Sequence, residues 1–138
     1  MILETAIGPV SAQRTGSPGA PVLQILGIPY ARAKRFHAPG PAPRPAPGSP
    51  INTGRCPQRL MPRALNLALR HFQLRPEWQP RHDTMDEDCL RLNVWTSGIR
   101  TPKPVLVFIH GGDCGSGTLP VYNGARLAEL GVVVVTIT

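Results

Sequence analysis

The sequence predicts an α/β fold in which antiparallel β segments lead into a mostly parallel central sheet. Two apolar runs, from Pro104 to Ile109 and from Val132 to Ile137, are typical of strands that are buried on both faces. Between them lie glycine turns and a short helical segment from Ala125 to Leu130, which Gly131 should end. This alternation of strand, helix and strand favours parallel pairing.

The first thirty residues predict short antiparallel strands. Ile2 to Ile7 and Val22 to Leu26 have strand character, and residues 16–19 (Gly-Ser-Pro-Gly) separate them as a turn. Residues 27–30 (Gly-Ile-Pro-Tyr) predict a corner after the second strand. Leu90 to Thr96 alternates apolar and polar side chains and predicts a further strand.

The middle of the chain predicts one loop and one helix. Six of the 17 prolines fall within residues 38–50, and proline at alternate positions blocks both helix and ladder pairing. We expect an extended surface loop there, with a PxxP-type ligand as an alternative. Pro62 opens a predicted helix that ends before Pro76. Its core-facing stripe is Ala64, Leu65, Ala68, Leu69 and Phe72.

The length predicts a single domain over residues 1–138. The charge in this domain is unevenly distributed. The formal net charge is +7, and residues 31–81 hold ten Lys/Arg against one acid, Glu77. Such a segment is either a set of solvated loops or a surface for nucleic acid or an anionic membrane. Because no aromatic residues interleave the arginines in a stacking pattern, no nucleic-acid partner is expected.

The ends of the chain predict its location and its extent. No apolar run reaches the roughly 18 residues of a transmembrane helix, and residues 1–10 lack a basic signal-peptide region. We therefore expect no membrane partner and a cytoplasmic protein, or a secreted one if a leader precedes this sequence. The last apolar strand, ending at Thr138, would leave an unprotected sheet edge, which predicts a domain that continues further.

Several motifs occur in an order that resembles the type-B carboxylesterase family, which includes cholinesterases and bacterial para-nitrobenzyl esterases. The resemblance runs along essentially the whole chain and implies the N-terminal part of an α/β-hydrolase fold. The segments that carry it are Gly27-Ile28-Pro29-Tyr30-Ala31, Arg35-Phe36, Cys56-Pro57-Gln58, residues 87–95 (Glu-Asp-Cys-Leu-Arg-Leu-Asn-Val-Trp), 104–112, Tyr122-Asn123-Gly124 and 132–137.

By this resemblance, Gly111, Gly112 and Asp113 form the loop whose backbone N–H groups stabilise an oxyanion. Glycine lets the backbone approach the substrate closely. Asp113 departs from the family's third glycine, and a carboxylate there opposes the developing negative charge. His110 is expected to be an orienting or packing residue rather than a base. The spacing of His110, Asp113 and Cys114 matches no zinc pattern, so neither metal nor cofactor is expected.

The resemblance also implies two structural pairings. Cys56 and Cys89 occupy the positions of a loop-closing disulfide, while the odd cysteine count favours free thiols in a reducing compartment. Arg35 and Glu87 match an ion pair that supports the fold. Arg91 departs from the family, which prefers an aromatic residue or Thr at that position.

No catalytic triad can be assembled from this sequence. None of the five serines lies in a Gly-x-Ser-x-Gly elbow, and the family places serine, acid and histidine after the oxyanion loop. We therefore expect a fragment of a carboxylic ester hydrolase that is inactive alone; the complete enzyme would act on small-molecule carboxylic esters. The alternatives are an inactive relic that serves as a binding module, and a basic binder of nucleic acid or anionic surfaces through residues 31–81.

Overall fold

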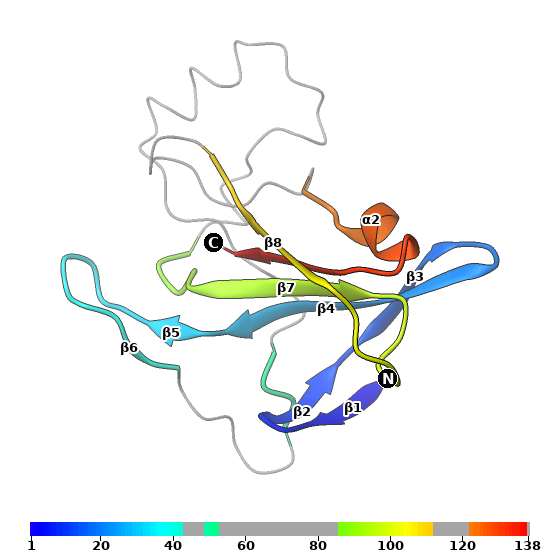
Figure 1. Cartoon of the computed structure of the whole chain (residues 1–138). Coiled ribbons are helices and arrows are strands. Elements are labelled where there is room, and N and C mark those ends of the chain that lie inside the picture. Colours follow the sequence, from blue (N-terminus) through cyan, green and yellow to red (C-terminus); the bar gives the residue numbers. More distant parts are fainter. Residues whose placement is uncertain (43–48, 53–85, 112–121, 138) are drawn as a thin grey trace.

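The computed structural model describes residues 1–42, 49–52, 86–111 and 122–137 (Figure 1). These residues form nine strands and one short helix. The elements are β1 (Ile2–Thr5), β2 (Gly8–Ser11), β3 (Gln13–Ser17), β4 (Ala20–Pro29), β5 (Ala31–Arg32), β6 (Gly40–Pro41), β7 (Arg91–Thr96), β8 (Val105–Ile109), α2 (Ala125–Glu129) and β9 (Val133–Ile137). The helix predicted after Pro62 and residues 43–48 of the predicted 38–50 loop lie outside the described residues.

The central sheet has five strands in the order β3-β4-β7-β9-β8. Only β8 and β9 pair in parallel, and the other three pairings are antiparallel. The described residues therefore form a mixed sheet in which antiparallel strands lead to the parallel pair β8 and β9, and this is compatible with part of an α/β fold. Parallel strands need a crossover connection, and among the described elements only α2 lies in a crossover between parallel neighbours. β3 and β4 are joined by a tight turn.

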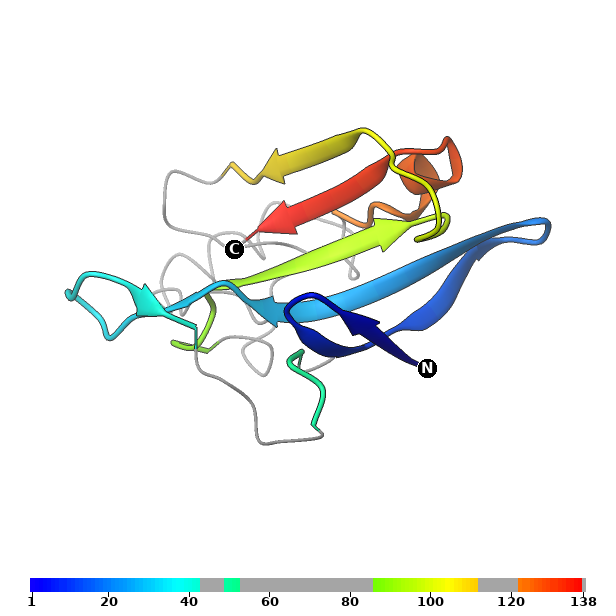
Figure 2. The same cartoon turned by 60° about the horizontal axis from the view of Figure 1, so that its bottom comes forward.

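The edge strands of the described sheet are β3 and β8, not the last strand of the chain. β9 lies between β7 and β8 and pairs with both, so the unprotected edge predicted for the last strand is wrong. All five residues of β8 are exposed, so burial on both of its faces was also wrongly predicted. The crossover inserts β9 between β7 and β8 and leaves β8 at the rim, where Figure 2 shows no described element on its outer side.

A β-bulge divides β4 into two halves. Ile25 pairs with Val94 and Ile28 pairs with Leu92. Between these two pairs, β4 contains one more residue than β7. Gly27 lies inside the bulge at φ +76°. The extra residue reverses the alternation of side chains, so Ile25 and Ile28 both join the same core cluster.

Two hydrophobic clusters lie on opposite faces of the sheet. Helix α2 covers one face and packs Ala125 and Ala128 against Val22, Trp95 and Val134. The β1–β2 hairpin, together with Ala12 and Ile51, covers the other face. That second cluster consists of Val10, Ala12, Ile25 and Ile28, with Leu3, Ile51, Leu92 and Val94 packed against it.

Asn52 fastens the hairpin side of the molecule to the sheet. This side chain is buried, with 7% of its surface exposed. Its Oδ1 accepts the Ser11 N–H at 2.6 Å, and its Nδ2 donates to the carbonyls of Ser11 at 2.8 Å and Leu26 at 3.0 Å. One amide thus satisfies backbone groups of both β2 and β4.

Candidate functional site

The predicted oxyanion loop begins at the carboxyl end of β8. In open α/β sheets, ligands bind outside the carboxyl ends of the strands, and the register of β8 with β9 brings Ile109 beside Ile137 at that edge. His110 and Gly111 follow directly. His110 Nδ1 lies 2.8 Å from the Gly111 carbonyl oxygen, which can only accept, so Nδ1 donates. Among the residues that the structure describes, none lies within 4 Å of where a Cβ on Gly111 would stand.

The remaining loop residues cannot be placed beside Gly111. Gly112 and Asp113 lie outside the described residues, as does Cys114. The exposed backbone of Gly111 leaves space for an approaching group, which is what an oxyanion loop needs. The donor role of Gly112 and Asp113 stays a prediction.

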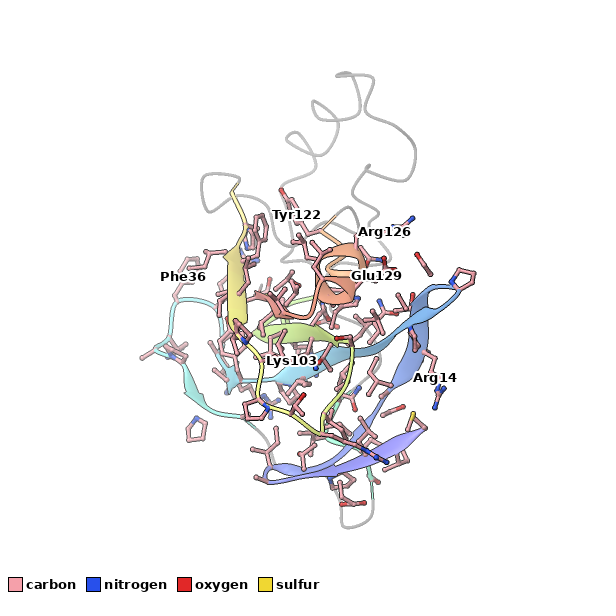
Figure 3. The ribbon with its side chains drawn as sticks, turned by 45° about the vertical axis from the view of Figure 1, so that its right-hand side comes forward. Arg14, Phe36, Lys103, Tyr122, Arg126 and Glu129 are labelled. Carbon is pink, nitrogen blue, oxygen red and sulfur yellow. The ribbon has the colours of Figure 1, made fainter. Side chains whose placement is uncertain are left out.

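An apolar groove of about 180 Å³ lies beside β8 on the face that carries α2. Phe108 and Tyr122 form its aromatic wall, with ring centroids 4.8 Å apart and planes inclined by 45°. Tyr122 precedes α2 in the chain, and in Figure 3 it lies on the side of α2 that faces β8. The other lining residues are Leu106, Asn123, Gly124, Leu127, Val134 and Thr136. The described lining residues are mostly apolar, so this groove suits apolar groups.

The start of α2 explains the Tyr122-Asn123-Gly124 segment in physical terms. Asn123 Oδ1 accepts the Ala125 N–H at 2.9 Å and so satisfies a free donor at the helix start. A Cβ on Gly124 would stand 2.6 Å from Val134 Cγ1 and 2.9 Å from Trp95 Cε3. Only glycine permits this close approach of helix and sheet. The sequence alone gave no sign of this crowding.

The β4 bulge is held by two side chains of β7. The Gly27 N–H donates to Asn93 Oδ1 at 3.0 Å, and Arg91 Nη1 donates to the Gly27 carbonyl at 3.2 Å. Both side chains are buried, and Asn93 Nδ2 also reaches Thr136 Oγ1 at 3.3 Å. A bulge leaves backbone groups without ladder partners. Asn93 and Arg91 supply those partners and connect β4, β7 and β9.

Arg91 therefore has a structural role that sequence reasoning missed. Its guanidinium also pairs with the Asp88 carboxylate and donates through Nε to the Asp88 carbonyl at 3.1 Å. A buried cation needs partners for its donors, and this arrangement provides them. This set of acceptors accommodates an arginine at position 91.

Arg35 and Glu87 lie against each other in a two-pronged ion pair. Arg35 Nε donates to Glu87 Oε2 at 3.2 Å, and Nη2 contacts Oε1. The hydrogen bond to Glu87 and its negative charge raise the pKa of Arg35. Both side chains are nearly half exposed, so the pair joins the segment after β5 to the one before β7 without burying charge. The ion pair is present, and its role in supporting the fold stays a prediction.

Cys89 is buried next to this pair, with 9% of its surface exposed. Its predicted disulfide partner, Cys56, lies outside the described residues, so the bridge stays a prediction. Among the described residues, no three His, Cys, Asp or Glu side chains gather into a metal site. No helix in the described part of the chain has the length and apolar character to cross a membrane.

Ser17, a described serine, has contacts that do not suit a nucleophile. Ser17 Oγ donates to Glu129 Oε1 at 2.9 Å and also contacts Arg126. A nucleophilic serine needs a neighbouring base such as histidine. Ser17 instead links the β3–β4 hairpin to α2.

Comparison with known proteins agrees with these motifs. A family model described as the carboxylesterase family matches residues 1–138. The acetylcholinesterase of Gallus gallus is 38% identical over 120 residues, which cover 82% of this chain and 15% of that protein. The cholinesterase of Mus musculus is 35% identical over 146 aligned positions, which cover 97% of this chain and 23% of that protein. The chain thus spans less than a quarter of the length of these relatives, and it belongs to the carboxylesterase family.

Proposed function

We propose that this chain supplies the oxyanion-loop part of a carboxylic ester hydrolase. The observation that carries the proposal is the family match over residues 1–138 together with His110 and Gly111 at the carboxyl end of β8. In the proposed reaction, a serine outside this chain attacks the ester carbonyl, and backbone N–H groups of Gly112 and Asp113 bind the oxygen that becomes negative. The substrate class is a small-molecule carboxylic ester.

The chain by itself contributes charge stabilisation without a nucleophile. Its sequence holds no Gly-x-Ser-x-Gly elbow, and Ser17 binds a carboxylate rather than a histidine. We expect the purified chain to remain unlabelled by a fluorophosphonate, which reacts with activated serines. Stoichiometric labelling of the folded chain would contradict the missing nucleophile.

A chimaera tests the charge-stabilising role directly. Residues 1–138 would replace the matching segment of the Gallus gallus acetylcholinesterase, and kcat/KM for ester hydrolysis would be measured. Gly112→Pro removes one backbone donor and should lower kcat by about 10²–10³-fold. Asp113→Gly removes the opposing carboxylate and should raise kcat. A matched Gly98→Ala variant, which changes a glycine outside the loop with open space around it, should leave kcat unchanged.

A further inference from the structure

Asn123 is followed by a glycine that the packing of the fold requires. A Cβ on Gly124 would stand 2.6 Å from Val134 Cγ1, so a larger residue does not fit after Asn123. Of the four asparagines in the sequence, only Asn123 precedes a glycine. Asparagine is a thermolabile residue, and its side-chain amide is lost by reaction with the next backbone nitrogen. Glycine has no Cβ to hinder the approach to that nitrogen.

The hydrogen bonds around Asn123 favour this reaction. The Ala125 N–H, which can only donate, gives its hydrogen to Asn123 Oδ1 at 2.9 Å. Such a donor stabilises the negative charge that develops on a carbonyl oxygen when a nucleophile adds to its carbon. Among the residues that the structure describes, no acceptor is bonded to Asn123 Nδ2 or to the Gly124 N–H. The leaving amine and the attacking nitrogen are therefore not held by hydrogen bonds to described residues.

The two other described asparagines have the opposite environment. Asn52 Nδ2 donates to two backbone carbonyls, at 2.8 and 3.0 Å, and Asn93 Nδ2 donates to Thr136 Oγ1 at 3.3 Å. Both side chains are buried. A β-branched residue follows each of them, Thr53 and Val94 respectively, and restricts the backbone at the nitrogen that would attack. Asn52 and Asn93 should therefore keep their amides.

We propose that Asn123 is a site of spontaneous deamidation. The Gly124 nitrogen gives its proton to solvent and attacks Asn123 Cγ. The Cγ–Nδ2 bond then breaks, and the amine takes a proton from water and leaves as ammonia. The product is a succinimide ring made of Asn123 and the Gly124 nitrogen. Water opens this ring at Cγ to give aspartate, or at the main-chain carbonyl to give isoaspartate.

The two products should affect the start of α2 differently. Aspartate keeps an oxygen that can accept the Ala125 N–H, and it caps a helix as well as asparagine does. Isoaspartate carries the main chain through Cβ and Cγ, which adds a methylene carbon between Tyr122 and Gly124 and removes the capping side chain. We expect this product to displace Tyr122 from Phe108, whose ring centroid lies 4.8 Å from that of Tyr122.

Peptide mass spectrometry of the 138-residue chain tests the site. The chain is kept folded in mildly alkaline buffer, and a second sample is kept in urea. In the folded sample, we expect the peptide with Asn123 to acquire the mass of the acid while Asn52 and Asn93 keep their amides. An intact Asn123 in the folded sample, at a time when urea has allowed its conversion, overturns the proposal. Equal conversion of all three asparagines in the folded sample overturns it as well.

Ala125→Pro tests the hydrogen bond to Asn123 Oδ1. Proline suits the first position of a helix and lacks the N–H, and loss of one hydrogen bond should slow conversion of Asn123 about tenfold. Asn52 and Asn93 report whether the variant is folded, because unfolding would expose their amides. Undiminished conversion in a folded Ala125→Pro chain contradicts the role of this bond. If the variant unfolds, the comparison of the parent chain with and without urea decides.

Asn123→Asp is the matched control for the effect on the fold. This variant has the charge of the deamidated chain with a normal main chain, and its urea midpoint should equal that of the parent chain. The isoaspartate form, separated from the aspartate form by chromatography, should unfold at a lower urea concentration. Equal midpoints for the two forms would contradict the predicted displacement at Tyr122.

Discussion

Ser17 and Glu129, which are 112 residues apart in sequence, meet through two hydrogen bonds to one carboxylate oxygen. Glu129 Oε1 accepts the Ser17 N–H at 2.7 Å and the Ser17 hydroxyl at 2.9 Å. In Figure 3, Glu129 and Arg126 lie on the side of α2 that faces the β3–β4 hairpin. This contact ties the first strand of the central sheet to the crossover helix.

Breaking this contact should loosen the helix from the hairpin. Glu129→Ala removes the acceptor for both bonds, and we expect a lower urea midpoint of unfolding with an unchanged slope. Ser17→Ala removes only the hydroxyl and keeps the backbone donor, so its effect should be smaller. The double variant should cost less than the sum of the two single variants, because they share one interaction. Strict additivity would show that the bond between the Ser17 hydroxyl and Glu129 does not stabilise the fold.

The same carboxylate predicts a loss of stability in acid. The hydrogen bonds from Ser17, and to a lesser extent Arg126, lower the pKa of Glu129 below its ordinary value. A depressed folded-state pKa stabilises the fold above the unfolded-state pKa, and that contribution is lost as the pH falls through the folded-state value. Urea midpoints measured from pH 6 to pH 3 should therefore fall less steeply for Glu129→Gln than for the parent chain. Parallel profiles would contradict this linkage.

Gly124→Ala should destabilise the fold by overpacking. The added methyl would stand 2.6 Å from Val134 Cγ1, closer than two carbon atoms can pack. The Gly124 backbone, at φ −83°, would otherwise accept alanine. Forcing a methyl into a packed interior costs about 1–3 kcal/mol, which outweighs the gain of about 0.4–1 kcal/mol from stiffening the unfolded chain.

The matched control for this substitution is Gly98→Ala. No described atom lies within 4 Å of a Cβ at Gly98. Equilibrium unfolding in urea should therefore show a lower free energy of unfolding for Gly124→Ala and little change for Gly98→Ala. Equal effects at the two positions would remove the steric explanation.

The apolar pattern predicted most strands but not their neighbours. Runs such as Val133–Ile137 and the alternating Arg91–Thr96 are strong local signals, and the structure confirms both as strands. β3 was missed because Gln-Arg-Thr-Gly-Ser carries no hydrophobic alternation and forms only by pairing with β4. Strand order depends on tertiary contacts. For this reason the exposed edge was assigned to the last strand and not to β8.

The candidate site was predictable only as far as its motifs extend. The resemblance drew attention to residues 27–31 and 87–95, and the structure shows Gly27, Arg91 and Asn93 in contact at the β4 bulge. The spacing of these residues did not predict the bulge, because the bulge arises from a one-residue mismatch between β4 and β7. Similarly, the crowding around Gly124 exists only once α2 lies against β9.

Asn93→Leu provides the sharpest test of how that bulge is held. Leucine has a similar size but no acceptor, so the Gly27 N–H would be left buried and without its partner. An unsatisfied buried donor costs about 1–3 kcal/mol, and urea unfolding should show a loss of that order. Thr136→Val is the control: it removes only the longer 3.3 Å contact to Asn93 and leaves the Gly27 bond in place, so its loss should be smaller. A larger loss from Thr136→Val would mean that the connection to β9, and not the bulge, depends on Asn93.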